Sequence, residues 1–179
     1  MTQIGNAYAQ ALYTLAKEET LTDTILKELK ALEEGFAQEP GFVRLLATHS
    51  LSKQERCDIL DNSFRDKIHP YVLNLLKLLT EKGYIRYFSD CCKAYCRQYN
   101  EDNGILPVCA VTAIALNDAQ IQKLTDKLAQ ITGKVIELTI RIDPQCLGGV
   151  RLDYDGKRVD GTVQSRLDAV RALLKNTVL

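Results

Sequence analysis

The side chains with the most reactive chemistry are six cysteines, three of which are clustered at Cys91, Cys92 and Cys96. Cys92 and Cys96 are four residues apart and therefore share one face of a helix. A zinc site needs cysteine pairs of the C-x2-C kind, or a quartet of cysteine and histidine ligands. Neither arrangement is present, so the sequence predicts no metal site. We interpret the cysteines as small hydrophobic side chains.

A second candidate is the segment from Asp143 to Leu167, which is rich in aspartate and glycine. Its Gly148-Gly149 pair lacks the following Gly-Lys-Ser/Thr of a phosphate-binding loop. Its aspartates are spaced more widely than calcium-loop ligands, and no glutamate stands at the twelfth position. The segment is therefore interpreted as turns and a helix cap. The residues assigned to these turns and caps are Gly148, Gly149, Asp160, Gly161 and Thr162.

No catalytic set of side chains can be assembled from this sequence. A nucleophilic cysteine would need a nearby histidine, but His49 and His69 lie far from the cysteine cluster in the chain. The prediction is a protein that is not an enzyme and binds no cofactor. A cysteine-based redox or thiol protein stays open as the alternative, and it would require an accessible thiol of low pKa.

Charge and hydropathy exclude two further classes of protein. The 179 residues carry 23 basic and 23 acidic side chains, and neither half of the chain is basic. Nucleic acid is therefore not expected as a partner. The best apolar run, Tyr71 to Leu79, is interrupted by Asn74 and Lys77 and is too short to span a bilayer. We expect a cytoplasmic protein without direct membrane insertion.

Apolar spacing predicts six helices in residues 1–104. Ser52 and Glu55 form a capping box before the fourth helix, and Pro70 suits the first turn of the fifth. The first and fifth helices carry more apolar surface than one core requires. The fifth is read either as a central core helix or as one wall of a groove for a partner's helix. The expected helices are 4–16, 21–37, 42–47, one after Ser52, 70–81 and 85–100.

Residues 105–179 are predicted to form a small α/β domain in the order β-α-β-β-α. The polar junction at 100–104 precedes strands expected at 105–116, 135–143 and 150–154. Asp155-Gly156 predicts a hairpin, and Thr162 is expected to cap a final helix. The overall fold class is α+β, a six-helix bundle followed by this domain. The expected inner face of the first helix in this domain is Ile121, Leu124, Leu128 and Ile131.

Several motifs with consistent order and spacing resemble one known family. Ala7-Tyr8-Ala9-x-Ala11-Leu12 resembles its opening helix, and Asn74-Leu75-Leu76-x-Leu78-Leu79 resembles its fifth helix. The most specific match is Leu147-Gly148-Gly149-Val150 followed by Asp160-Gly161-Thr162-Val163. The family is the δ subunit of the bacterial F-type ATP synthase, equivalent to the mitochondrial oligomycin-sensitivity-conferring protein. The resemblance covers essentially the whole chain, with Thr162 where the family usually has serine.

The resemblance implies a non-catalytic stator subunit at the cytoplasmic face of the plasma membrane. In this family the helical domain binds the N-terminal helix of an α subunit between its first and fifth helices. The C-terminal domain contacts the b subunits of the peripheral stalk, so that rotor torque drives ATP synthesis coupled to ion transport. The residues expected to line the helix-binding groove are Tyr8, Ala11, Leu12, Leu15, Val72, Leu75, Leu76 and Leu79.

Overall fold

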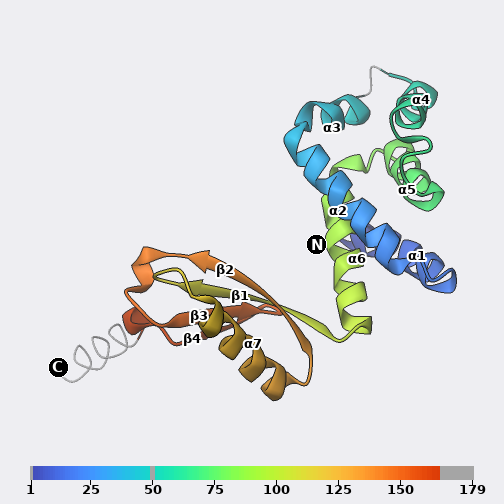
Figure 1. The fold of residues 1–179 in the computed structure, drawn as a ribbon. Coiled ribbons are helices and arrows are strands. Elements are labelled where there is room, and N and C mark those ends of the chain that lie inside the picture. Colours follow the sequence, from blue (N-terminus) through green and yellow to red (C-terminus); the bar gives the residue numbers. More distant parts are fainter. Residues whose placement is uncertain (1, 49–50, 166–179) are drawn as a thin grey trace, which may run out of the picture. The chain divides into compact units, whose positions relative to one another are not determined.

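A computed structural model of the chain describes residues 2–48 and 51–165, which fall into two compact units (Figure 1). The boundary between the units along the chain falls between Tyr99 and Asn100. It lies inside the last helix of the bundle, a few residues before the expected junction at Gly104. The predicted fold class is confirmed, with helices in the first unit and a small α/β structure in the second. Among the described residues, no helix combines the length and the apolar character needed to cross a bilayer.

The first unit contains the six predicted helices. The third helix begins at Pro40 rather than at residue 42 as expected, because proline is well placed in a first helical turn. The residues Ile85–Tyr87 form a separate 3-10 turn before the sixth helix. The helices are α1 (Gln3–Glu18), α2 (Thr22–Gln38), α3 (Pro40–Ala47), α4 (Lys53–Phe64), α5 (Pro70–Glu81) and α6 (Phe88–Asp102).

Side-chain hydrogen bonds explain where two of these helices begin. The Ser52 hydroxyl accepts a bond from the Glu55 amide at 3.2 Å, and the Glu55 carboxylate accepts one from the Ser52 amide at 2.8 Å. These bonds lower the pKa of Glu55 and complete the predicted capping box of α4. The Thr2 amide donates to Asp90 on α6 at 3.0 Å, which fixes the start of α1 against that helix.

One continuous hydrophobic core joins the six helices. Its largest fully buried side chain is Tyr95, whose ring packs edge-on against Tyr13 at 5.2 Å between centroids. The Tyr95 hydroxyl donates to the Thr22 carbonyl at 3.2 Å, so this buried polar group is satisfied. Gly5 brings α1 close to α6, since a Cβ at this position would lie 2.8 Å from the Asp90 Cβ.

A buried arginine links three helices. Arg56 of α4 is only 6% exposed, and its guanidinium donates to the carbonyls of Leu46 at 3.1 Å and Thr80 at 3.4 Å. These carbonyls lie in the last turns of α3 and α5, where backbone acceptors lack helical partners and the helix dipole is negative. Arg56 therefore supplies a donor to the Leu46 carbonyl and a second donor to the Thr80 carbonyl, which also accepts a bond from the Gly83 amide at 3.1 Å.

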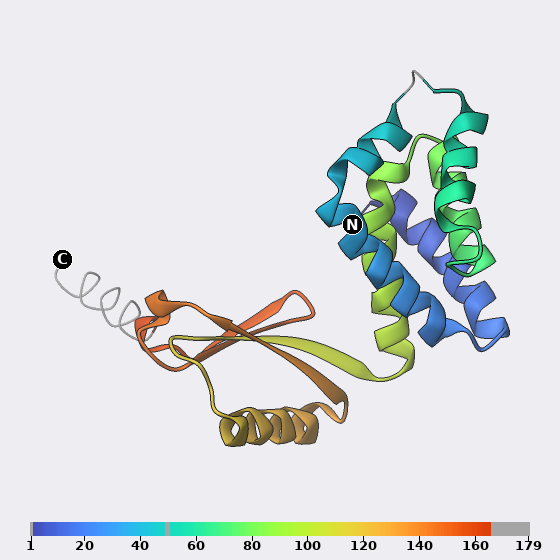
Figure 2. The same cartoon turned by 45° about the horizontal axis from the view of Figure 1, so that its top comes forward.

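The second unit is a four-stranded mixed sheet in the order β2-β1-β3-β4, with α7 against one face (Figure 2). β1 pairs in parallel with β2 and antiparallel with β3, as expected for a strand-helix-strand unit followed by a hairpin. The elements are β1 (Ile105–Thr112), α7 (Asp118–Thr132), β2 (Val135–Ile142), a 3-10 turn (Pro144–Cys146), β3 (Val150–Tyr154) and β4 (Lys157–Asp160).

The predicted order β-α-β-β-α was incomplete because it omitted β4. The hairpin prediction is confirmed: Asp155 and Gly156 connect β3 and β4 with φ values of 46° and 71°. Two consecutive positive φ angles match the twist of the flanking strands, which favours an Asp-Gly pair. β1 ends at Thr112 rather than near Leu116. At this strand end the Thr112 hydroxyl donates to the Ile114 carbonyl at 2.7 Å.

The helix α7 begins and ends as predicted, with a capping box at Asn117 and Gln120 and a left-handed Gly133. The expected inner face was partly wrong, because Ile131 is 82% exposed. α7 lies mainly against β2, an edge strand, so no α7 side chain is fully buried. Helical structure resumes at residues 163–165, and the rest of the predicted final helix lies outside the described residues.

Candidate partner-binding surface

The helices α1 and α5 are neighbours that run in opposite directions. Tyr71, in the first turn of α5, donates its hydroxyl to the carboxylate of Glu19, the residue that follows α1. This hydrogen bond, with burial and the charge of Glu19 contributing less, raises the pKa of Tyr71. The contact holds the start of α5 at the end of α1.

Most of the predicted groove residues belong to the core of the bundle. Leu12 of α1 is 5% exposed, and Leu76 of α5 is fully buried. Such side chains stabilise the two helices but have little surface left for a partner. The predicted residues buried in this way are Leu12, Val72, Leu75, Leu76 and Leu79.

The remaining predicted residues reach the surface of α1. Ala11 is exposed, Leu15 is 45% exposed, and Tyr8 is half-buried against the core. Leu78 of α5 is 46% exposed, although it was not among the predicted groove residues. Its position between buried Leu75 and Leu79, on a helix apolar nearly all round, was the available signal. We call Ala11, Leu15 and Leu78 the α1–α5 surface.

The cysteines in the described part of the chain are free thiols, most of them buried. Burial raises the pKa of Cys91 to about 11 and raises that of Cys92 further. The Cys92 thiol is directed at the Leu29 carbonyl, 3.7 Å away. A reactive thiol needs a lowered pKa and access to solvent. The raised pKa values and the burial of Cys91 and Cys92 therefore disfavour a redox role for these two thiols. The described residues also contain no group of three potential metal ligands.

The glycine-rich turn of the second unit brings two backbone segments into close contact. Gly149 has φ 83°, and a Cβ there would lie 2.5 Å from the Gly161 carbonyl oxygen. The Gly161 amide donates to Val150 at 3.1 Å, and the Val163 amide donates to Gly148 at 3.0 Å. The turn therefore connects the start of β3 to the segment after β4, and its glycines serve close packing.

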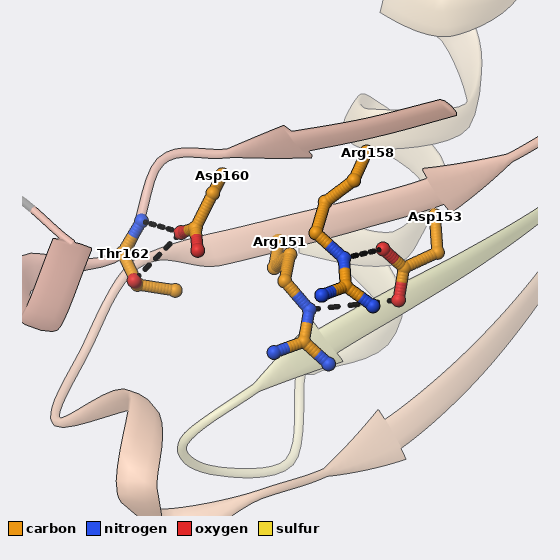
Figure 3. Close-up of polar contacts among 5 residues, drawn as sticks. All are labelled: Arg151, Asp153, Arg158, Asp160 and Thr162. Atoms are coloured by element: carbon orange, nitrogen blue, oxygen red, sulfur yellow. Dashed lines mark hydrogen bonds and ion pairs between the residues drawn. The ribbon is translucent and has the colours of Figure 1, made fainter. Parts of the chain in front are cut away.

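Asp160 and Thr162 form the next part of this connection (Figure 3). The Thr162 hydroxyl and amide donate to Asp160 Oδ1 at 2.7 and 2.9 Å, which lowers the pKa of Asp160. The Thr162 hydroxyl oxygen in turn accepts a bond from the Ser165 amide at 3.2 Å, the geometry of a helix N-cap.

Charged side chains cross-link the β3–β4 hairpin on the same face (Figure 3). Arg158 Nε donates to Asp153 Oδ1 at 2.7 Å, which lowers the pKa of Asp153 and raises that of Arg158. Arg151 Nε lies 3.5 Å from the other oxygen of Asp153 in an ion pair without hydrogen-bond geometry. Asp153 and Asp160 are thus engaged by arginine and threonine rather than directed together as metal ligands.

The structure is a helical bundle followed by a small α/β unit, with most thiols buried and with Asp153 and Asp160 engaged by neighbouring side chains. The family described as "ATP synthase delta (OSCP) subunit" matches residues 4–174. The chain belongs to this family, and it is a non-catalytic structural subunit of the ATP synthase complex.

Individual relatives match over nearly the whole chain. The ATP synthase subunit delta of Clostridioides difficile (strain 630) is 30% identical, covering 98% of this chain and 97% of that protein. The subunit of the same name from Lacticaseibacillus casei (strain BL23) is 32% identical, covering 96% and 94%. A chain in the Toxoplasma gondii mitochondrial ATP synthase hexamer has the same fold, with a TM-score of 0.77 and 21% identity, covering 97% of this chain and 98% of that one.

Proposed function

We propose that this chain is the stator link between the catalytic head and the peripheral stalk of an ATP synthase. The first unit binds the N-terminal helix of an α subunit at the α1–α5 surface, and the second unit binds the b subunits. The link prevents the head from turning with the rotor, so that torque drives ATP synthesis coupled to ion transport. The protein acts at the cytoplasmic face of the plasma membrane as a peripheral component.

The observation that carries the proposal is exposed apolar surface on two neighbouring helices whose inner faces already fill a core. Leu15 and Leu78 leave nearly half of their side chains in water, at 45% and 46%. Ala11, one turn before Leu15, adds a small side chain over which another helix can approach closely. Such a surface suits an amphipathic helix whose apolar face supplies the missing contacts.

The second unit offers separate apolar positions for the b subunits. Ile142 at the end of β2, Leu147 in the following turn and Val159 on β4 are 54%, 64% and 52% exposed. Large aliphatic side chains left in water favour association with another apolar surface. These residues support a stalk-binding role for the second unit.

The test is co-purification from membranes with a tagged full-length chain. The original chain should retain both the α-containing head and the b subunits. Ala11→Arg places a charge in an apolar interface, so the head should be lost while the b subunits remain. Ala37→Arg makes the same change at an exposed position on α2, and it should retain both partners. Retention of the head by a folded Ala11→Arg protein would refute the assignment of this surface.

A further inference from the structure

The helical unit has an apolar concavity bounded by α2, α3 and α4, with a volume of about 580 Å³. α3 and α4 stand apart at this end of the bundle in both views (Figures 1 and 2). Ala31 and Gly35 form one wall, and three phenylalanine rings contribute to the lining. None of its residues belongs to the α1–α5 surface, so the stator role proposed above leaves this groove without a function.

The phenylalanine rings form a mutually packed floor. The centroid of Phe36 lies 5.8 Å from that of Phe42 and 6.3 Å from that of Phe64, and Phe42 and Phe64 are 5.9 Å apart. All three rings also pack against the main core. Because the rings pack on one another and on the core, the floor is preorganised, and binding an apolar side chain there does not require ordering the rings first.

Gly35 is not required by the bundle's own packing. It lies within α2, where glycine costs about 0.5–1 kcal/mol relative to alanine. A Cβ at Gly35 would meet no atom within 4 Å, and its φ lies outside the positive range that favours glycine. Ala31 lies one turn earlier on the same face. Two small residues in line along α2 leave room for the backbone of another helix, as small residues do wherever helices pack closely.

The groove carries a negative charge, which favours a basic amphipathic helix over an acidic one. Glu39 is the one charged side chain in its lining, and it is exposed. Within the described residues its carboxylate makes no ion pair or hydrogen bond. An occupant with a lysine or arginine beside its apolar face would complement this carboxylate, whereas an acidic helix would be repelled.

We propose that this groove is a second docking site for an amphipathic, basic helix of a protein partner. A large apolar side chain of that helix packs on the phenylalanine floor. Its backbone passes over Ala31 and Gly35, and its lysine or arginine faces Glu39. The room left beside the helix backbone of α2 favours a helix over a compact small molecule, which would need only the floor.

The test uses a designed helical peptide of leucine, alanine and lysine, with leucines at i, i+3, i+4 and i+7. A matched peptide carries glutamate in place of lysine. Both are titrated against the full chain carrying Ala11→Arg, which removes the α1–α5 surface from the measurement. Chemical-shift perturbation locates each peptide, calorimetry gives its Kd, and sedimentation reports self-association of the chain.

Gly35→Leu adds a side chain to the wall of the groove at a position where a Cβ would meet no atom within 4 Å, so the variant should remain folded. It should weaken the lysine peptide at least tenfold, equivalent to about 1.4 kcal/mol. Ala37→Leu adds the same side chain at an exposed α2 position outside the groove, and it should bind normally. Glu39→Lys should weaken the lysine peptide and strengthen the glutamate peptide.

Three results would overturn the proposal. The first is no binding of the lysine peptide, or binding that Gly35→Leu leaves unchanged. The second is equal affinity for the lysine and glutamate peptides, which would remove the charge selection. The third is self-association of the chain that Gly35→Leu abolishes, because the occupant would then be a second copy. Since Ala11→Arg is present throughout, none of these results depends on the α1–α5 surface.

Discussion

The α1–α5 surface allows a binding free energy to be worked out from the exposure of two leucines. Leu15 and Leu78 are 45% and 46% exposed in the free chain. Full burial of a leucine side chain contributes about 1.5–3 kcal/mol, so covering the exposed part of each contributes about 1 kcal/mol. Leu15→Ala or Leu78→Ala should therefore weaken binding of a helix about fivefold.

The assay is calorimetric titration of the full-length chain with a peptide from the N-terminus of the ATP synthase α subunit. The double variant should lose about 2 kcal/mol, roughly thirtyfold in Kd, if the two positions act independently. Leu76→Ala serves as the contrast, because Leu76 is fully buried. That change should lower the free energy of unfolding by about 2–5 kcal/mol and act on binding only through folding.

The exposure argument fails if the folded double variant binds this peptide with unchanged affinity. It also fails if Ala11→Arg, which introduces a charge beside Leu15, has no effect on Kd. Thermal unfolding monitored by circular dichroism must accompany each titration, since lost binding by a partly unfolded variant would not address the surface.

Three further predictions concern stability. Gly149→Ala should destabilise the second unit by about 2 kcal/mol or more, because φ is 83° and the new Cβ would lie 2.5 Å from the Gly161 oxygen. Hydrogen exchange in β3 and β4 should report this loss. Arg56→Met should lower the free energy of unfolding by about 2–4 kcal/mol in urea titrations, since two buried helix-end carbonyls lose a charged donor. Burial raises the pKa of Cys91 to about 11, so its thiol ionises at lower pH in the unfolded chain than in the folded chain. This contribution to stability should be complete below the ordinary thiol pKa and should fall as pH rises toward about 11, whereas Cys91→Ala should remove that part of the pH dependence.

Matched variants separate these effects from general disturbance. Gly156→Ala also acts at a positive φ, 71°, but its Cβ meets nothing within 4 Å, so its cost should be the smaller. Arg65→Met removes an arginine whose side chain is 71% exposed, and stability should barely change. Equal losses for Gly149→Ala and Gly156→Ala, or for Arg56→Met and Arg65→Met, would contradict the packing arguments.

Local signals explain why the helices and turns could be predicted from the sequence. The Ser52–Glu55 capping box, the Gly133 helix end and the Asp155-Gly156 hairpin each depend on residues close together in the chain. Such features need no knowledge of the tertiary structure. The six-helix order and the change to strands after residue 104 follow from the same kind of evidence.

Exposure could not be predicted in the same way, because it depends on which helices pack together. Leu76 and Leu78 lie on one apolar helix, yet one is fully buried and the other is 46% exposed. Ile131 continues the apolar stripe of α7, but it is 82% exposed because α7 lies against an edge strand. The groove between α2, α3 and α4 likewise exists only after Phe36 and Phe64, far apart in sequence, have come together.

The position of β1 has a mechanical consequence. The chain leaves α6 at Asp102 and reaches β1 at Ile105, so a pull transmitted from the helical unit acts along this strand. β1 is an interior strand that pairs with β2 over eight positions and with β3 over five. Its antiparallel hydrogen bonds lie across the pulling direction, so they are loaded together in shear rather than opened one at a time. Force spectroscopy should therefore give a higher rupture force along β1 than across the β3–β4 hairpin, and similar forces would refute this reasoning. For the stator role proposed above, this arrangement would let the sheet carry tension before the β3–β4 hairpin opens.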